Sequence, residues 1–169
     1  MINKLKKLFQ DNNIDGYIIP KNDEFFSEYS NPDRLRMISN FSGSMGLALI
    51  LNNESHLFVD GRYTLQAKNQ SGNKFQIHQI PFVTPETILS KKQKTLSLGF
   101  DPKLFTSRGL NRIIGKQHKL LPIHENLIDK ISIDKKHKNT NYFYVLSKKV
   151  AGNSPKRKID KLIKILLKR

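Results

Sequence analysis

The segment that decides the fold is residues 41–67, FSGSMGLALILNNESHLFVDGRYTLQA. In it, a loop of small residues (42–46) precedes an apolar run at 47–51, and an Asn-Asn turn at 52–55 leads into a second run at 56–59. Two apolar runs joined by such a turn predict a β-hairpin. We expect the chain before the hairpin to build one edge of its sheet, and the chain up to about residue 132 to complete and cover that sheet.

Before the hairpin, the pattern predicts two helices and one strand. Apolar residues at helical spacing predict an amphipathic helix over residues 2–12. The apolar run 17–19, closed by a proline that lacks a donor, predicts a buried strand. A second helix is expected over residues 32–38, with Asn31 as its cap and Pro32 at its first position.

After the hairpin, helical and extended patterns alternate. Helices are expected at 61–70, 84–90, 106–114 and 126–131, and strands at 75–80, 96–100 and 120–123. This alternation, together with one hairpin, predicts an α/β domain with three layers, in which helices flank a mixed sheet.

The chain beyond residue 131 has a different character. Residues 132–141 are polar and without period, so we expect a linker there. Residues 142–169 read as a short terminal unit, with a strand at 142–146 and a helix at 155–168. One strand and one helix cannot bury the apolar stripe of that helix, so the main body (residues 1–131), a partner chain or a missing second domain must cover it.

The net charge of +16 is unevenly distributed. Residues 1–129 hold 17 Lys and Arg against 12 Asp and Glu, whereas residues 130–169 hold 13 against 2. Basic charge alone gives only non-specific affinity for phosphates, and no recognition motif accompanies it. We therefore do not expect nucleic acid to be the main partner, although a nucleic-acid binder that uses the basic C-terminus stays open as an alternative.

Other features of the composition point to the cytoplasm. There is no cysteine, so neither a disulfide framework nor a thiolate metal site is possible. No apolar run is long enough to span a bilayer, and the Lys-rich start lacks the apolar core and cleavage site of a signal peptide. We expect a cytoplasmic protein without a membrane partner.

The search for catalytic chemistry gives few candidates. The five histidines are scattered, so no metal site is expected within this chain. The loop Ser42-Gly43-Ser44 lacks the first glycine of G-x-S-x-G and precedes a strand, which favours a loop of close backbone approach over a nucleophile. Asp60, at a strand-to-helix junction, is typical of a helix cap.

Arg62 is the residue that we single out. It follows a glycine at the sheet's edge, and its planar fork suits a carboxylate or a peptide carbonyl. The other interpretation is a surface arginine paired with a neighbouring acid, and the spacing does not decide between the two.

A series of short motifs resembles, in order and spacing, the N-terminal domain of Xaa-Pro aminopeptidases (aminopeptidase P, creatinase/prolidase superfamily). The motifs are DGYIIP (15–20), SEY (27–29), DRLR (33–36), FSGS (41–44), LFVDGRY (57–63) and GFDP (99–102). ENLID (125–129) resembles that domain's closing segment, and YVL (144–146) through AGNS (151–154) resembles the start of the second domain in three-domain enzymes. The chain departs from the pattern at Asn40, where the family usually has Gly, and at Met45, where it usually has Ala.

The resemblance implies a fold related to ribonuclease H and a role outside catalysis. Family members cleave before proline with two metal ions, usually manganese, held in a C-terminal domain that this chain lacks, so we expect a truncated or split form that is inactive alone. Arg62 matches a family arginine that contacts substrate, within a motif supported by Asp60, Gly61, Tyr63, Ser42, Gly43 and Ser44. The implied partners are a separately encoded catalytic domain or a second copy, with peptide substrate only in a complete enzyme. The alternative to this reading is a free-standing interaction module that docks through its terminal helix.

Overall fold

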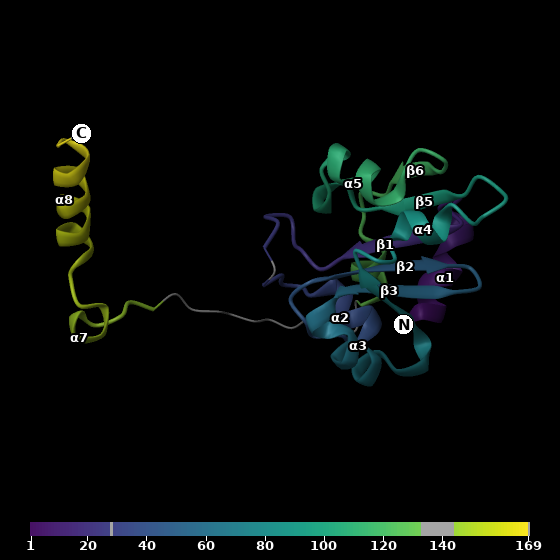
Figure 1. Cartoon of the computed structure of the whole chain (residues 1–169), viewed down its shortest axis with the longest axis horizontal. Coiled ribbons are helices and arrows are strands. Elements are labelled where there is room, and N and C mark those ends of the chain that lie inside the picture. Colours follow the sequence, from purple (N-terminus) through teal and green to yellow (C-terminus); the bar gives the residue numbers. More distant parts are fainter. Residues whose placement is uncertain (28, 133–143, 169) are drawn as a thin grey trace. The chain divides into compact units, whose positions relative to one another are not determined.

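The computed structural model describes residues 1–27, 29–132 and 144–168. It divides into two compact units, Met1–Lys135 and Lys136–Arg169. Within the described residues of the first unit, six strands form one sheet in the order β4-β3-β2-β1-β5-β6 (Figure 1). The strands are β1 (Gly16–Pro20), β2 (Gly46–Leu51), β3 (Ser55–Asp60), β4 (Gln76–Ile80), β5 (Ser97–Phe100) and β6 (Lys119–Pro122).

The sheet is mixed, as the sequence predicts. The predicted hairpin is the antiparallel pair β2–β3, while β3–β4, β1–β5 and β5–β6 are parallel pairs. The expectation that the chain before the hairpin builds one edge of the sheet is wrong, because its strand β1 lies between β2 and β5 and is not an edge strand. Every residue of β1 is buried, which fits a central strand covered on both faces.

Helices cover both faces of the sheet. They are α1 (Ile2–Asp11), α2 (Arg34–Ser39), α3 (Thr64–Ser71), α4 (Pro85–Leu89), α5 (Ser107–Ile114) and α6 (Leu127–Ile131), with 3₁₀ turns η1 (Gly61–Tyr63), η2 (Gly72–Lys74) and η3 (Pro102–Leu104). Successive side chains of a strand point to opposite faces of the sheet, and β1 contributes to a separate core on each face. Tyr17 and Ile19 pack with α1, α2, α3 and α6 in a first core, whereas Ile18 packs with α4 and α5 in a second core. The predicted three-layer α/β architecture is therefore confirmed.

Polar side chains cap the N-termini of most of these helices, at positions that the sequence indicates. Thr106 accepts a hydrogen bond from Gly109 N at the start of α5, and Asn126 accepts one from Ile128 N at the start of α6. The start predicted for α2 is wrong: Asp33, not Asn31, is the cap, because its carboxylate accepts from Arg36 N at 3.0 Å. The helix thus begins at Arg34, beyond Pro32.

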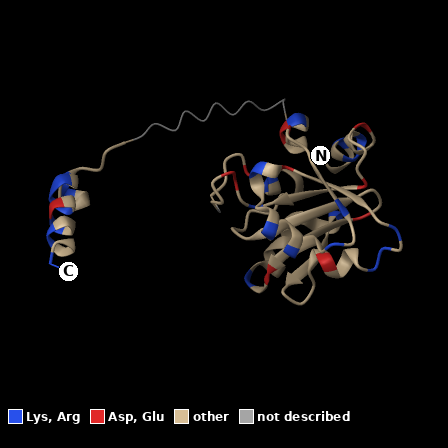
Figure 2. Ribbon diagram, turned by 90° about the horizontal axis from the view of Figure 1, so that it is seen from above, with Lys and Arg blue, Asp and Glu red and all other residues tan. Residues whose placement is uncertain are grey.

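The second unit contains two helices among its described residues, α7 (Lys148–Ala151) and α8 (Pro155–Leu166). The predicted strand at 142–146 is not found at residues 144–146, while 142 and 143 lie outside the described residues. Of the predicted linker 132–141, Ser132 caps the end of α6 and the rest also lies outside them. In α8, the apolar side chains are exposed and most turns carry Lys or Arg (Figure 2).

Candidate functional site

The two segments of the predicted motif meet at one edge of the sheet. In the β2–β3 pair, Gly46 lies opposite Val59, so the loop that precedes β2 and the turn that follows β3 are neighbours. The carboxyl ends of β1, β4 and β5 lie at the same edge, because these strands run parallel to β3 or antiparallel to β2. This edge therefore collects Ser42, Gly43 and Ser44 from one side and residues 60–63 from the other.

Asp60 organises the turn that carries Arg62. Its carboxylate accepts a hydrogen bond from Arg62 N at 2.9 Å, and this bond caps the start of η1. The same carboxylate forms an ion pair with Arg62 Nη2 at 2.6 Å. The hydrogen bond from the Arg62 side chain holds the pKa of Asp60 below its ordinary value. The prediction that Asp60 is a helix cap is confirmed, and the arginine is paired with a neighbouring acid. The side chain of Arg62 is nevertheless 74% exposed.

Tyr63 connects Arg62 to the small-residue loop. Its hydroxyl lies 2.9 Å from Ser44 Oγ, and the Arg62 guanidinium carbon lies 5.2 Å from its ring centroid. The Tyr63 ring also packs edge-to-face on the buried ring of Phe41, with centroids 5.8 Å apart. A guanidinium over a tyrosine face is attracted by the ring quadrupole, so Tyr63 supports the position of Arg62.

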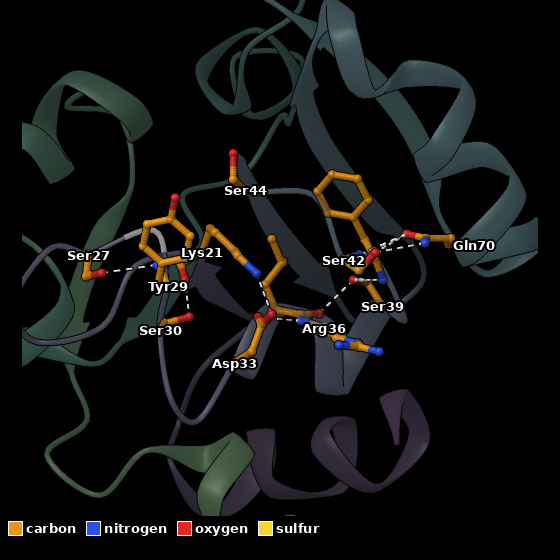
Figure 3. Close-up of polar contacts among 12 residues, drawn as sticks. Lys21, Ser27, Tyr29, Ser30, Asp33, Arg36, Ser39, Ser42, Ser44 and Gln70 are labelled. Atoms are coloured by element: carbon orange, nitrogen blue, oxygen red, sulfur yellow. Dashed lines mark hydrogen bonds and ion pairs between the residues drawn. The ribbon is translucent and has the colours of Figure 1, made fainter. Parts of the chain in front are cut away.

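The hydroxyl of Ser42 is held by two amides from α3. Gln70 Nε2 donates to Ser42 Oγ at 2.9 Å, and Ser42 N donates to Gln70 Oε1 at 2.8 Å (Figure 3). Gln66 Nε2 donates to the same Oγ at 3.0 Å. An amide cannot act as a general base, so this arrangement anchors the loop and does not activate a nucleophile. Sequence reasoning missed both glutamines, although their spacing of four residues would place them on one face of a helix.

The two glycines of the motif are required to different degrees. A Cβ on Gly43 would come within 2.2 Å of the Phe41 ring, which is fully buried. A Cβ on Gly61 would meet only the flexible end of Gln79, at 2.9 Å. Gly43 therefore serves the packing of Phe41 under the loop, in agreement with a loop of close approach.

Sequence reasoning also missed a hollow of about 560 Å³ at this edge of the sheet. Its lining includes Ser44 and Met45 from the small-residue loop and Lys21 from the segment that follows β1. Lys21 points at Asp33 and forms an ion pair with it, as Figure 3 shows. The hollow is built by loops far apart in the sequence, so only the strand pairing brings its walls together.

A histidine pair joins the start of β3 to the middle of β4. His56 Nδ1 is 2.9 Å from His78 Nε2, and His56 Nε2 is 3.3 Å from Glu54 Oε2, which also pairs with Lys92. Burial lowers the pKa of both histidines, opposed for each by the charge of Glu54. The nitrogens of His56 face different partners, and in the described part of the chain no three His, Asp or Glu side chains are grouped so as to hold a metal ion.

Among the residues that the structure describes, no helix is both long and apolar enough to cross a membrane.

Known proteins of similar sequence and structure point to one family. The family model for the creatinase/prolidase N-terminal domain matches residues 1–131. A probable Xaa-Pro aminopeptidase P of Penicillium rubens is 32% identical over 98% of this chain and 29% of its own length, and aminopeptidase P1 of Lotus japonicus is 33% identical over 91% and 25%.

Among solved structures, an X-prolyl aminopeptidase from Caenorhabditis elegans, described as a cytosolic enzyme with a di-nuclear active site, aligns with a TM-score of 0.75. It is 26% identical, and the alignment covers 99% of this chain and 30% of that one. This chain thus spans less than a third of the length of these relatives. The family model, the shared fold and the motifs gathered at one sheet edge lead to one assignment: the chain belongs to the creatinase/prolidase N-terminal domain family.

Proposed function

We propose that this chain acts as the non-catalytic N-terminal domain of a Xaa-Pro aminopeptidase, and that Arg62 contacts the peptide substrate when a catalytic domain is present. The observation that carries the proposal is the geometry of Arg62, which Asp60 orients and Tyr63 supports while most of its side chain stays exposed. Arg62 Nε and Nη2 already donate to the Asp60 carboxylate, so a peptide carbonyl or carboxylate would share the exposed guanidinium with Asp60.

In this proposal the water-activating chemistry belongs to a separate catalytic part. Two manganese ions would be bound there, where they would activate the water that cleaves the bond before proline. The chain described here would supply a scaffold, a substrate-contacting arginine and an assembly surface, and would be inactive alone. We propose a cytoplasmic location, supported by the description of the Caenorhabditis elegans enzyme as cytosolic.

A chimera tests the role of Arg62. This chain would replace the matching N-terminal part of the Penicillium rubens relative, and release of the N-terminal residue from Ala-Pro-Ala would be measured with manganese. Losing a charged hydrogen bond of about 1.5–3 kcal/mol predicts that Arg62→Ala lowers kcat/KM by roughly 10- to 150-fold. Lys68→Ala, at an exposed position of α3, is the control and should leave kcat/KM unchanged. Equal activity of the Arg62→Ala and parent chimeras would refute substrate contact, and a folded, metal-loaded but inactive chimera would contradict the role proposed for the chain.

We propose that the catalytic partner covers the apolar face of α8. Ile159, Leu162, Ile163 and Leu166 are between 47% and 58% exposed, and their spacing places them on one side of the helix. Co-purification of this chain with the remaining part of the Penicillium rubens relative should be lost in the Ile159→Glu, Leu162→Glu double variant. Undiminished co-purification would count against this surface, and a homodimer that the double variant abolishes would assign it to a second copy instead.

A further inference from the structure

The hollow that Ser44 and Met45 line lies where the topology of the sheet opens a crevice. Strands β1 and β5 are parallel neighbours, but α2, which follows β1, packs in the first core, whereas α5, which follows β5, packs in the second. The connections therefore leave the sheet toward opposite faces. In α/β folds, ligands bind in the crevice at the carboxyl ends of such strands. The hollow is lined by Pro20 at the end of β1, by Lys21 directly after it, and by Leu104 and Phe105 after β5, which places it in this crevice.

The interior of the hollow is apolar. Its walls include Met45, Leu47, Ile80, Pro81, Leu104 and Phe105. Its volume of about 560 Å³ is within the range of sites that bind small ligands. Met45 is 40% and Phe26 is 55% exposed, so large apolar side chains at this hollow are open to solvent. These features suit a bulky apolar group more than a sugar or a phosphate.

The charges that line the hollow have one sign. In the part of the chain that the structure describes, its charged lining residues are Lys21 and Arg112, and no carboxylate lines it. Lys21 is neutralised by Asp33. Arg112 is exposed and has no acidic partner among the described residues. The hollow thus combines an apolar interior with a cation that an incoming carboxylate can neutralise.

The hollow is linked to the Arg62 turn through one hydrogen bond. Ser44 lines it, and the Oγ of Ser44 lies 2.9 Å from the hydroxyl of Tyr63, over whose ring Arg62 sits. A peptide that contacts Arg62 is therefore within a few residues' length of the hollow.

We propose that the hollow binds a bulky apolar side chain of a peptide substrate, with Arg112 pairing to a carboxylate next to it. This inference rests on the proposed function, because it takes the ligand to be the peptide that Arg62 contacts. It adds a substrate class: peptides that carry an apolar residue followed by an acidic or terminal carboxylate downstream of proline.

The chain contains no tryptophan, so a tryptophan peptide provides a clean fluorescence signal for binding. The probe is Ala-Pro-Ala-Trp-Asp, and the matched peptide without a carboxylate is Ala-Pro-Ala-Trp-Lys amide. We expect a blue shift of the indole emission with the first peptide and at least tenfold weaker binding of the second. Met45→Glu and Arg112→Glu should each weaken binding at least tenfold. Met45→Glu adds a carboxylate to the lining of the hollow, and Arg112→Glu reverses the charge of its cation.

Two matched variants on α3 serve as controls. Leu65→Glu places the same acid at an exposed apolar position, and Lys68→Glu reverses an exposed cation. Both should stay within twofold of the parent chain. All four changed side chains are exposed, and circular dichroism will verify that each variant is folded.

Several results would overturn the proposal. They are no binding of the probe by the folded parent chain, equal binding of the two peptides, or binding that Met45→Glu and Arg112→Glu leave unchanged. A dimer that Met45→Glu abolishes, with no peptide binding, would assign the hollow to a second copy. Binding that depends on Arg62 but not on Arg112 would reject the hollow and leave the proposed function standing, so the two failures are distinguishable.

Discussion

The carboxylate of Asp60 binds both the backbone and the side chain of Arg62. It lies 2.9 Å from Arg62 N and 2.6 Å from Arg62 Nη2. Asparagine caps helices about as well as aspartate but carries no charge. We therefore expect Asp60→Asn to keep the unfolding midpoint of the chain nearly unchanged and Asp60→Ala to lower it, in urea unfolding followed by circular dichroism. Equal midpoints for the two variants would show that the cap does not stabilise this turn.

The hydrogen bond between Tyr63 and Ser44 links the two halves of the site. Removing it in Tyr63→Phe should lower the free energy of unfolding by about 1 kcal/mol. Ser44→Ala should cost a similar amount, and the double variant should cost less than the sum, because both changes remove one interaction. Tyr29→Phe is the control, since Tyr29 is 83% exposed. Additive losses in the double variant would show that the two hydroxyls are not coupled.

Gly43 is required because the Phe41 ring occupies the space of a Cβ. We expect Gly43→Ala to lower the free energy of unfolding by about 1–3 kcal/mol, the usual cost of overpacking a core. Gly61→Ala should cost less, because the end of Gln79 can move aside. The comparison is a pair of urea unfolding curves, and a larger loss for Gly61→Ala would contradict the packing account.

The histidine pair makes stability depend on pH. Because the pKa values of His56 and His78 are lowered in the folded chain, the unfolded chain binds more protons on acidification. Their contribution to stability is full above about pH 6.5, the ordinary histidine pKa, and is lost as the pH falls below it.

This dependence can be measured as the urea midpoint between about pH 7.5 and about pH 5.5, around the ordinary histidine pKa. We expect the midpoint to fall with pH in the parent chain and to fall less steeply in His78→Gln. His124→Gln, at an exposed position, should keep the parent slope. A parent midpoint that is flat across this range would refute the assignment.

The sequence predicts the elements of the fold better than their arrangement. The hairpin is predictable because its two strands are adjacent and joined by a turn signal. The place of β1 is not, because Tyr17, Ile18 and Ile19 are apolar on both faces and their pattern does not name the neighbouring strands. For α2, two residues of capping type, Asn31 and Asp33, compete for one helix start, and only the contact of Asp33 with Arg36 N decides between them.

The site shows the same limit. Asp60 as a cap can be inferred from its place between a strand and a helix. The contacts of Ser42 with Gln66 and Gln70 join positions 24 and 28 residues apart, so they depend on how α3 packs. The hollow depends on the parallel pairing of β1 with β5, which brings Lys21 and Phe105 to one crevice. Pairing between distant strands leaves no local signal, and that is why these features could not be predicted.

The most direct test of the account is a peptidase assay of the purified chain alone. Release of the N-terminal residue from Xaa-Pro peptides would be followed with and without manganese, with the bound metal measured in the same sample. The account predicts no release and no stoichiometric manganese on this chain, because its described residues bring no metal-binding group together. Manganese-dependent release by this chain alone would contradict the account.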